Sequence, residues 1–204
     1  AVAREIEDIE ALIDLAGGSA CVYGISSGAA LAFEAALALG DKVKKLAMYE
    51  APYNDDPGAR QRWRQFRQEL KAALAEGRRG DALGLFMILL GMPADQLEVM
   101  RPEPFWPVME AVAPTIAYDV AILGEEAAVP TERAARLTTP ALIMDGAGSA
   151  ETYPFMHVTA VALAQAMPNA EHRTLPDQTH EVAPEAMAPV LMEYFSTIFP
   201  VVAD

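Results

Sequence analysis

The chain has 204 residues, of which 52% are hydrophobic and 22% charged, which excludes a disordered or low-complexity protein. Its 15 basic and 29 acidic residues give a formal net charge of −14, and we therefore expect no nucleic-acid partner. A single cysteine, Cys21, excludes an intrachain disulfide, and no Cys/His pattern has zinc spacing. No apolar run is long enough to cross a bilayer, so we expect a cytoplasmic protein with no membrane partner, no metal and no organic cofactor.

The first 54 residues predict a strand–helix–strand unit behind an initial helix. Apolar residues recur at helical spacing from Ile6 to Ala16, and two glycines then end a helix of about four turns. The apolar run 20–23 predicts a buried strand, 27–39 a helix that ends at a glycine, and 43–49 a second strand. Tight connections between these elements predict a parallel sheet.

The middle of the chain changes character. Residues 55–139 carry little strand signal and predict helices over 60–76, 81–90, 94–100 and 105–123, punctuated by prolines. After Pro140 the alternation resumes, with strands at 141–144 and 171–175 and helices at 155–167 and 186–199. The fold class is therefore α/β, a mostly parallel sheet with helices on both faces. Residues 1–54 and 140–204 form its core, and 55–139 is an inserted helical cap lying over the sheet.

The strongest motif is Gly24-Ile25-Ser26-Ser27-Gly28, which matches G-x-S-x-G between the first strand and the next helix. That context predicts a nucleophile elbow, with Ser26 on a sharp turn in a strained backbone conformation. Gly24 and Gly28 would avoid a collision where strand and helix cross. The N–H of Ser27, at the start of the helix, would stabilise an oxyanion. The alternative is that Ser26 simply caps the helix.

A serine nucleophile needs a base and an acid that orients the base. His180 is the preferred base because it follows strand 171–175 and therefore lies at the carboxyl edge of the sheet. His172, within that strand, is expected at an edge or surface, and His157, on a helix, is expected in a packing or solvent position. The alternative for His180 is an ordinary loop histidine.

Three carboxylates compete for the role of the acid. Glu50 follows strand 43–49 and precedes the rigid turn of Ala51 and Pro52. Asp145 ends strand 141–144 before Gly146, where it could instead bond its own backbone in a turn. Glu151 is a third candidate. We favour Glu50 and keep Asp145 as the alternative acid.

The elbow GISSG, the strand PALIMDG and the QTH before the last helix make the whole chain resemble the α/β-hydrolase superfamily, in particular small bacterial hydrolases with a helical cap. The resemblance implies that the acid usually stands at the position of Ser149, and that some members move it to the place of Glu50. It also implies that four strands and a second oxyanion donor precede the elbow, and this sequence begins after them.

The chain is therefore expected to be a serine hydrolase that cleaves a small ester, thioester, lactone or activated C–C bond through Ser26, His180 and Glu50, with a small acyl compound as its partner. An acyltransferase or a cofactor-free haloperoxidase would use the same triad. A weakly active or inactive binding protein is the third possibility, since one oxyanion segment is missing.

The absent early strands also predict an exposed edge. Strand 20–23 would lose a neighbour, and its unpaired N–H and C=O groups would offer a template for association. The sequence thus predicts either a fragment of a longer protein or a chain that pairs, for example as a homodimer, through that edge.

Overall fold

The computed structural model describes residues 2–197, and they fall into two compact units. One unit holds Ala3–Tyr53 together with the chain from Val129 onward, and it contains the sheet. The other holds Val2 and Asn54–Ala128 and is helical. None of the helices among the described residues has the length and the hydropathy that a membrane span requires.

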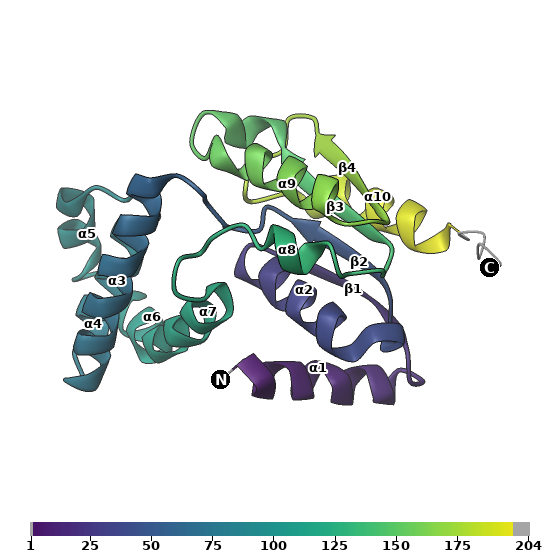
Figure 1. The fold of residues 1–204 in the computed structure, drawn as a ribbon. Helices are drawn as coiled ribbons and strands as arrows, with labels where there is room; N and C mark the ends of the chain where they lie inside the picture. The colour runs from purple at the N-terminus through teal and green to yellow at the C-terminus, as the bar shows by residue number, and fades with distance from the viewer. Residues whose placement is uncertain (1, 198–204) are drawn as a thin grey trace. The chain divides into compact units, whose positions relative to one another are not determined.

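The sheet unit alternates helices and strands along the chain. Its elements are α1 (Val2–Leu15), β1 (Ala20–Ile25), α2 (Ser27–Leu39), β2 (Val43–Tyr49), α8 (Thr131–Ala134), β3 (Ala141–Gly146), α9 (Phe155–Ala166), β4 (Ala170–Leu175) and α10 (Pro184–Ser196). The four strands are all parallel and follow the order β1-β2-β3-β4. This confirms the predicted fold class (Figure 1). The predicted end of the last helix, at 199, lies outside the described residues.

Alternate residues of the central strands face the two sides of the sheet. On one side, Ala47 and Tyr49 of β2 pack with Leu142 and Met144 of β3 against Met187 and Tyr194 of α10. On the other side lie α2, which contacts β1 and β2, and α9, which contacts β3 and β4. Successive side chains along β2 and β3 therefore alternate between the α10 side and the side of α2 and α9, because side chains in a strand repeat every two residues.

Strand β1 is the edge strand of the described sheet and pairs only with β2 there. It is longer than expected, because it continues through Gly24 and Ile25. Association through this edge stays a prediction.

The helical unit is built around its own apolar core. Its helices are α3 (Pro57–Ala75), α4 (Arg79–Leu89), α5 (Ala94–Met100), α6 (Trp106–Val112) and α7 (Ile116–Leu123). The helix expected over 105–123 is in fact two helices, because Pro114 lacks the N–H that an uninterrupted helix needs and lies in a 3₁₀ turn, Ala113–Thr115. Trp63, Phe66 and Trp106 are central to the core of this unit.

The second boundary of the insertion differs from the expected one at 139. Val129–Thr139 belongs to the sheet unit, where α8 contacts α9. Arg133 of α8 also forms a two-pronged ion pair with Glu34 of α2, at 2.6 and 2.5 Å. The sequence did not predict α8, because this short helix has no periodic apolar pattern. Its ion pair joins residues 99 positions apart and therefore leaves no local signal either.

Candidate active site

Ser26 occupies the sharp turn between β1 and α2. Its φ of 56° and ψ of −130° lie in a region that L-residues rarely adopt, so the strained backbone predicted for this position is confirmed. The Ser26 N–H donates to the carbonyl of Tyr49 at 2.9 Å. This bond ties the turn to the end of β2 and so places Ser26 beside Glu50, the next residue along that strand.

The two glycines of the motif have different roles. A Cβ on Gly24 would stand 2.2 Å from the carbonyl oxygen of Gly28, so only glycine allows β1 to cross α2 this closely. A Cβ on Gly28 would meet nothing within 4 Å among the described residues. The collision expected at Gly28 is therefore wrong: this residue contributes the backbone against which Gly24 packs.

The capping alternative for Ser26 is not what the structure shows. Ser26 stands at the N-cap of α2, yet its side chain makes no capping hydrogen bond. Its backbone carbonyl instead accepts from Ala29 at 2.9 Å and Ala30 at 3.3 Å. The hydroxyl is thus left available. Among the described residues the N–H of Ser27, at the first position of the helix, has no backbone acceptor.

Glu50 and His180 form a close pair, although 130 positions separate them. One carboxylate oxygen of Glu50 lies 2.7 Å from His180 Nδ1, and the other accepts the N–H of Gly146 at 2.9 Å. The carboxylate is fully buried, whereas the histidine side chain is 29% exposed. An ionised carboxylate can only accept, so Nδ1 carries a proton, and in the neutral imidazole Nε2 then has the lone pair.

Glu50 itself has a φ of 48°, a second positive value at the carboxyl end of a parallel strand. Its N–H donates to the carbonyl of Met144 at 3.0 Å. The backbone is thus turned out of the sheet while the side chain stays against Gly146, and this turn presents the carboxylate to the loop that carries His180.

Three contacts hold the His180 loop in place. The Tyr49 hydroxyl donates to the carbonyl of Thr179 at 2.6 Å, and the Gly148 N–H donates to the carbonyl of Gln178 at 2.8 Å. The ring of Tyr153 lies edge-on to the His180 ring at 5.8 Å. Burial and the nearby charge of Glu50 raise the pKa of Tyr49, which therefore stays a protonated donor.

Removing the Tyr49 hydroxyl tests this anchor. We expect Tyr49→Phe to lower the free energy of unfolding in urea by about 0.5–1.5 kcal/mol, because the carbonyl of Thr179 loses its donor. Tyr53→Phe is the matched control, since the Tyr53 hydroxyl is buried without a hydrogen-bond partner among residues 2–197. It is expected not to lower stability, because it removes a buried hydroxyl that already lacks a partner. Equal losses in both variants would contradict the anchoring role.

Asp145, the alternative acid, is placed elsewhere. Its buried carboxylate contacts His172 Nε2 at 2.5 Å and His157 Nδ1 at 3.0 Å, on the α9 side of the sheet, and makes no hydrogen bond with His180. Glu151 is exposed and makes none with His180 either, within the described chain. Ser149, where the superfamily resemblance usually places an acid, is buried.

The structure thus brings Glu50 and His180 together at the sheet edge where Ser26 lies. It does not join Ser26 to His180, since no hydrogen bond links their side chains among the described residues. Sequence reasoning missed Tyr49 and Thr179 as supports of His180, because a tyrosine in an apolar strand resembles ordinary core. It also missed the contacts of Asp145 with two histidines. The sequence did contain a signal for them, because the polar residues His172 and Thr174 alternate along β4 and therefore share one face of the sheet.

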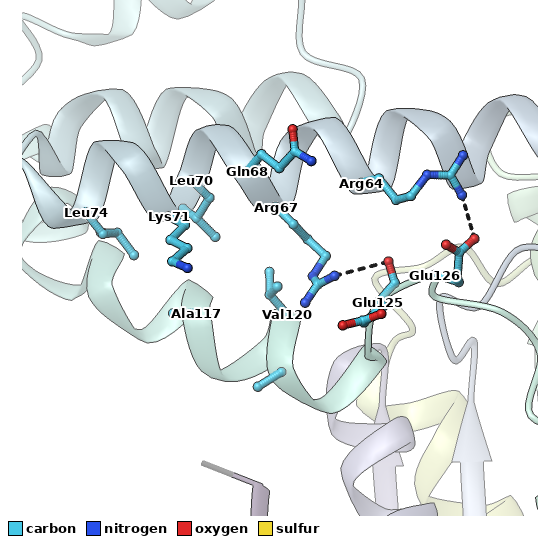
Figure 2. A pocket seen from close by; sticks show the side chains of 11 residues that line it. Arg64, Arg67, Gln68, Leu70, Lys71, Leu74, Ala117, Val120, Glu125 and Glu126 are labelled. Atoms are coloured by element: carbon cyan, nitrogen blue, oxygen red, sulfur yellow. Dashed lines mark hydrogen bonds and ion pairs between the residues drawn. The ribbon is translucent and has the colours of Figure 1, made fainter.

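The helical unit contains a hollow of about 630 Å³ between α3 and α7 (Figure 2). Leu70, Leu74 and Val120 supply apolar lining, and none of the candidate site residues takes part. Two basic side chains at its rim are already engaged within the unit: Arg64 pairs with Glu126 at 2.6 Å, and Arg67 donates to the carbonyl of Glu125 at 3.3 Å. These bonds engage Arg64 and Arg67 without an external anion.

No protein-family model matches the chain, and no curated protein sequence matches it. Solved structures do. An α/β hydrolase from Sphaerobacter thermophilus DSM 20745 is 46% identical, with a TM-score of 0.77, and the match covers 96% of this chain and 75% of that one. An α/β hydrolase from a Medee basin deep-sea metagenome is 19% identical, with a TM-score of 0.64 and coverage of 97% and 73%. A thermophilic esterase from Thermogutta terrifontis is 21% identical, with a TM-score of 0.60 and coverage of 93% and 70%. The two more distant structures show a shared fold.

Proposed function

Because this chain belongs to the α/β-hydrolase family, we propose that it is a serine hydrolase that cleaves small esters through Ser26, His180 and Glu50. The observation that carries the proposal is the contact between the buried Glu50 carboxylate and His180. Glu50 directly follows Tyr49, whose carbonyl accepts the N–H of Ser26 and so holds the strained turn. A strained serine beside a histidine oriented by a carboxylate is the constellation that activates a hydroxyl.

Each group has a definite task in this proposal. The Ser26 Oγ attacks the acyl carbon while His180 Nε2 takes its proton, and the N–H of Ser27 donates to the oxyanion that forms. His180 then protonates the leaving alcohol, so the C–O bond of the ester breaks and an acyl-serine remains. Water, deprotonated by His180, attacks that acyl group, the bond to Ser26 Oγ breaks, and His180 returns the proton to Ser26 as the acid leaves. Glu50 keeps the imidazole in the tautomer that this sequence requires.

Covalent labelling tests the proposal without knowledge of the natural substrate. The purified chain is treated with a fluorophosphonate, in which a reactive serine displaces fluoride, and the labelled residue is then found by tandem mass spectrometry. We expect one equivalent of label, located on Ser26. Tandem spectra are needed because Ser19, Ser26 and Ser27 share one tryptic peptide.

A heat-unfolded sample is the control, because the activation of Ser26 depends on the folded turn and on His180. Circular dichroism before labelling establishes that the native sample is folded. An absence of label on the folded chain, or a label on a serine other than Ser26, would contradict the proposed mechanism.

A further inference from the structure

A second cluster of titratable side chains lies outside the proposed triad. Asp145 at the end of β3, His157 in the first turn of α9 and His172 in β4 bring one ligand atom each to within 4.8 Å of one another. Both imidazoles face the same carboxylate, at 3.0 Å for His157 Nδ1 and 2.5 Å for His172 Nε2. The two rings lie edge to face with centroids 5.4 Å apart.

The charge of this cluster is poorly balanced by its partners. The Asp145 side chain is 2% exposed, and among residues 2–197 its oxygens otherwise receive only the Thr174 hydroxyl, at 3.2 and 3.3 Å. No lysine or arginine bonds to it within the described chain. A buried carboxylate that faces neutral imidazoles is costly, and a bound cation removes that cost as a protonated imidazole would.

We propose that Asp145, His157 and His172 form a binding site for one divalent transition ion of borderline softness, such as Zn²⁺. Two imidazole nitrogens and one carboxylate oxygen are the donor types that such an ion prefers, and three protein ligands leave a coordination position for water. Hard ions such as Mg²⁺ prefer a set composed of oxygens, so the two histidines select against them.

The two spacings between Asp145 and the histidines are close to those that a bound ion needs. Ligand atoms about 2.0–2.1 Å from a tetrahedral zinc stand roughly 3.3 Å apart. The Asp145 to His157 contact of 3.0 Å is close to this spacing, and the Asp145 to His172 contact must open by less than 1 Å. His157 has the freedom to move because its side chain is 54% exposed, which also leaves a path for the ion. Thr174 would remain bonded to the carboxylate and orient it, as partners of metal ligands commonly do.

The sequence did not reveal this site because its three ligands are widely spaced. Asp145 and His157 are 12 positions apart and Asp145 and His172 are 27, which matches no short zinc pattern. The register of the sheet creates the site instead: Asp145 pairs with Thr174 and Ile143 with His172, so these side chains share the face that α9 covers.

Co²⁺ titration of the EDTA-treated, tag-free chain tests the proposal, because Co²⁺ replaces Zn²⁺ and reports its ligands by visible absorption. We expect saturable binding of one ion, an absorption stronger than that of aqueous Co²⁺, and displacement by Zn²⁺. His157→Ala and His172→Ala are each expected to weaken Co²⁺ binding by at least about 100-fold, since even a residue that only supports a ligand contributes 10–100-fold.

His180→Ala is the matched control, because it removes the remaining histidine and leaves the cluster intact. It should bind Co²⁺ with the affinity of the unmodified chain. His157 lies at an exposed position, so His157→Ala is expected to keep the fold, and a loss of binding there reports on the ligand. The proposal is overturned by an absence of saturable binding, by unchanged affinity in His157→Ala, or by an equal loss in His180→Ala. None of these outcomes depends on hydrolysis, so they are separate from the fate of the proposed triad.

Discussion

The Ser26→Ala variant is expected to hydrolyse p-nitrophenyl acetate at least about 10⁴-fold more slowly than the unmodified chain, because removing a triad nucleophile leaves only binding and the oxyanion donor. The measurement is kcat/KM from the release of p-nitrophenol. The fold should survive, since Ser26 makes no side-chain capping bond and alanine is smaller than serine.

Ser19→Ala is the matched control for this loss. Ser19 is a half-buried serine directly before β1, outside the proposed site, and its replacement should leave kcat/KM unchanged. If Ser26→Ala retains most of the activity while its circular dichroism is native, Ser26 is not the nucleophile. The hydrolysis would then proceed through other residues.

The Glu50→Gln variant is expected to lower kcat by about 10³–10⁴-fold with little change in KM. Its side-chain oxygen can still accept the Gly146 N–H, so its amide nitrogen must face His180 Nδ1. An amide N–H donates, and therefore Nδ1 becomes the acceptor and the proton moves to Nε2, where it blocks the transfer from serine. The loss arises from the wrong tautomer while the packing is preserved.

Asp145→Asn is the comparison that decides between the two acids. Its carboxylate contacts His157 and His172, so we expect this variant to reduce stability more than turnover. The measurement pairs kcat with the midpoint of thermal unfolding for both variants. If Asp145→Asn lowers kcat far more than Glu50→Gln does, Glu50 is not the acid.

The proposed site is built on two strained backbone positions. Ser26 and Glu50 each have a positive φ without being glycine, and such residues typically cost on the order of 1–3 kcal/mol apiece. Each is held by a hydrogen bond from its own N–H to a carbonyl of the next strand, Tyr49 for Ser26 and Met144 for Glu50. These two hydrogen bonds to the sheet therefore help to offset the cost of the backbone conformations that expose the Ser26 hydroxyl and direct the Glu50 carboxylate.

Much of this architecture is determined locally by the sequence. Apolar runs bounded by glycine and proline predict the first three strands, whereas β4 is a mixed polar and apolar strand, and the alternation with helices predicts that all four are parallel. The Gly24 to Gly28 motif predicts the strained turn at Ser26, because a short strand that runs directly into a helix leaves no other path. The position of Glu50 at a strand end makes it a candidate acid from spacing alone.

Only the tertiary structure decided which carboxylate contacts which histidine. Glu50 reaches His180 across 130 positions and Asp145 reaches His172 across 27, and neither pairing leaves a periodic signal in the sequence. The parallel register and the two faces of the sheet make the choice: Glu50 turns toward the His180 loop, whereas Asp145 points to the face covered by α9. Spacing can bring two carboxylates to the same sheet edge, but the direction of each side chain depends on the strand's alternation and on a single backbone angle.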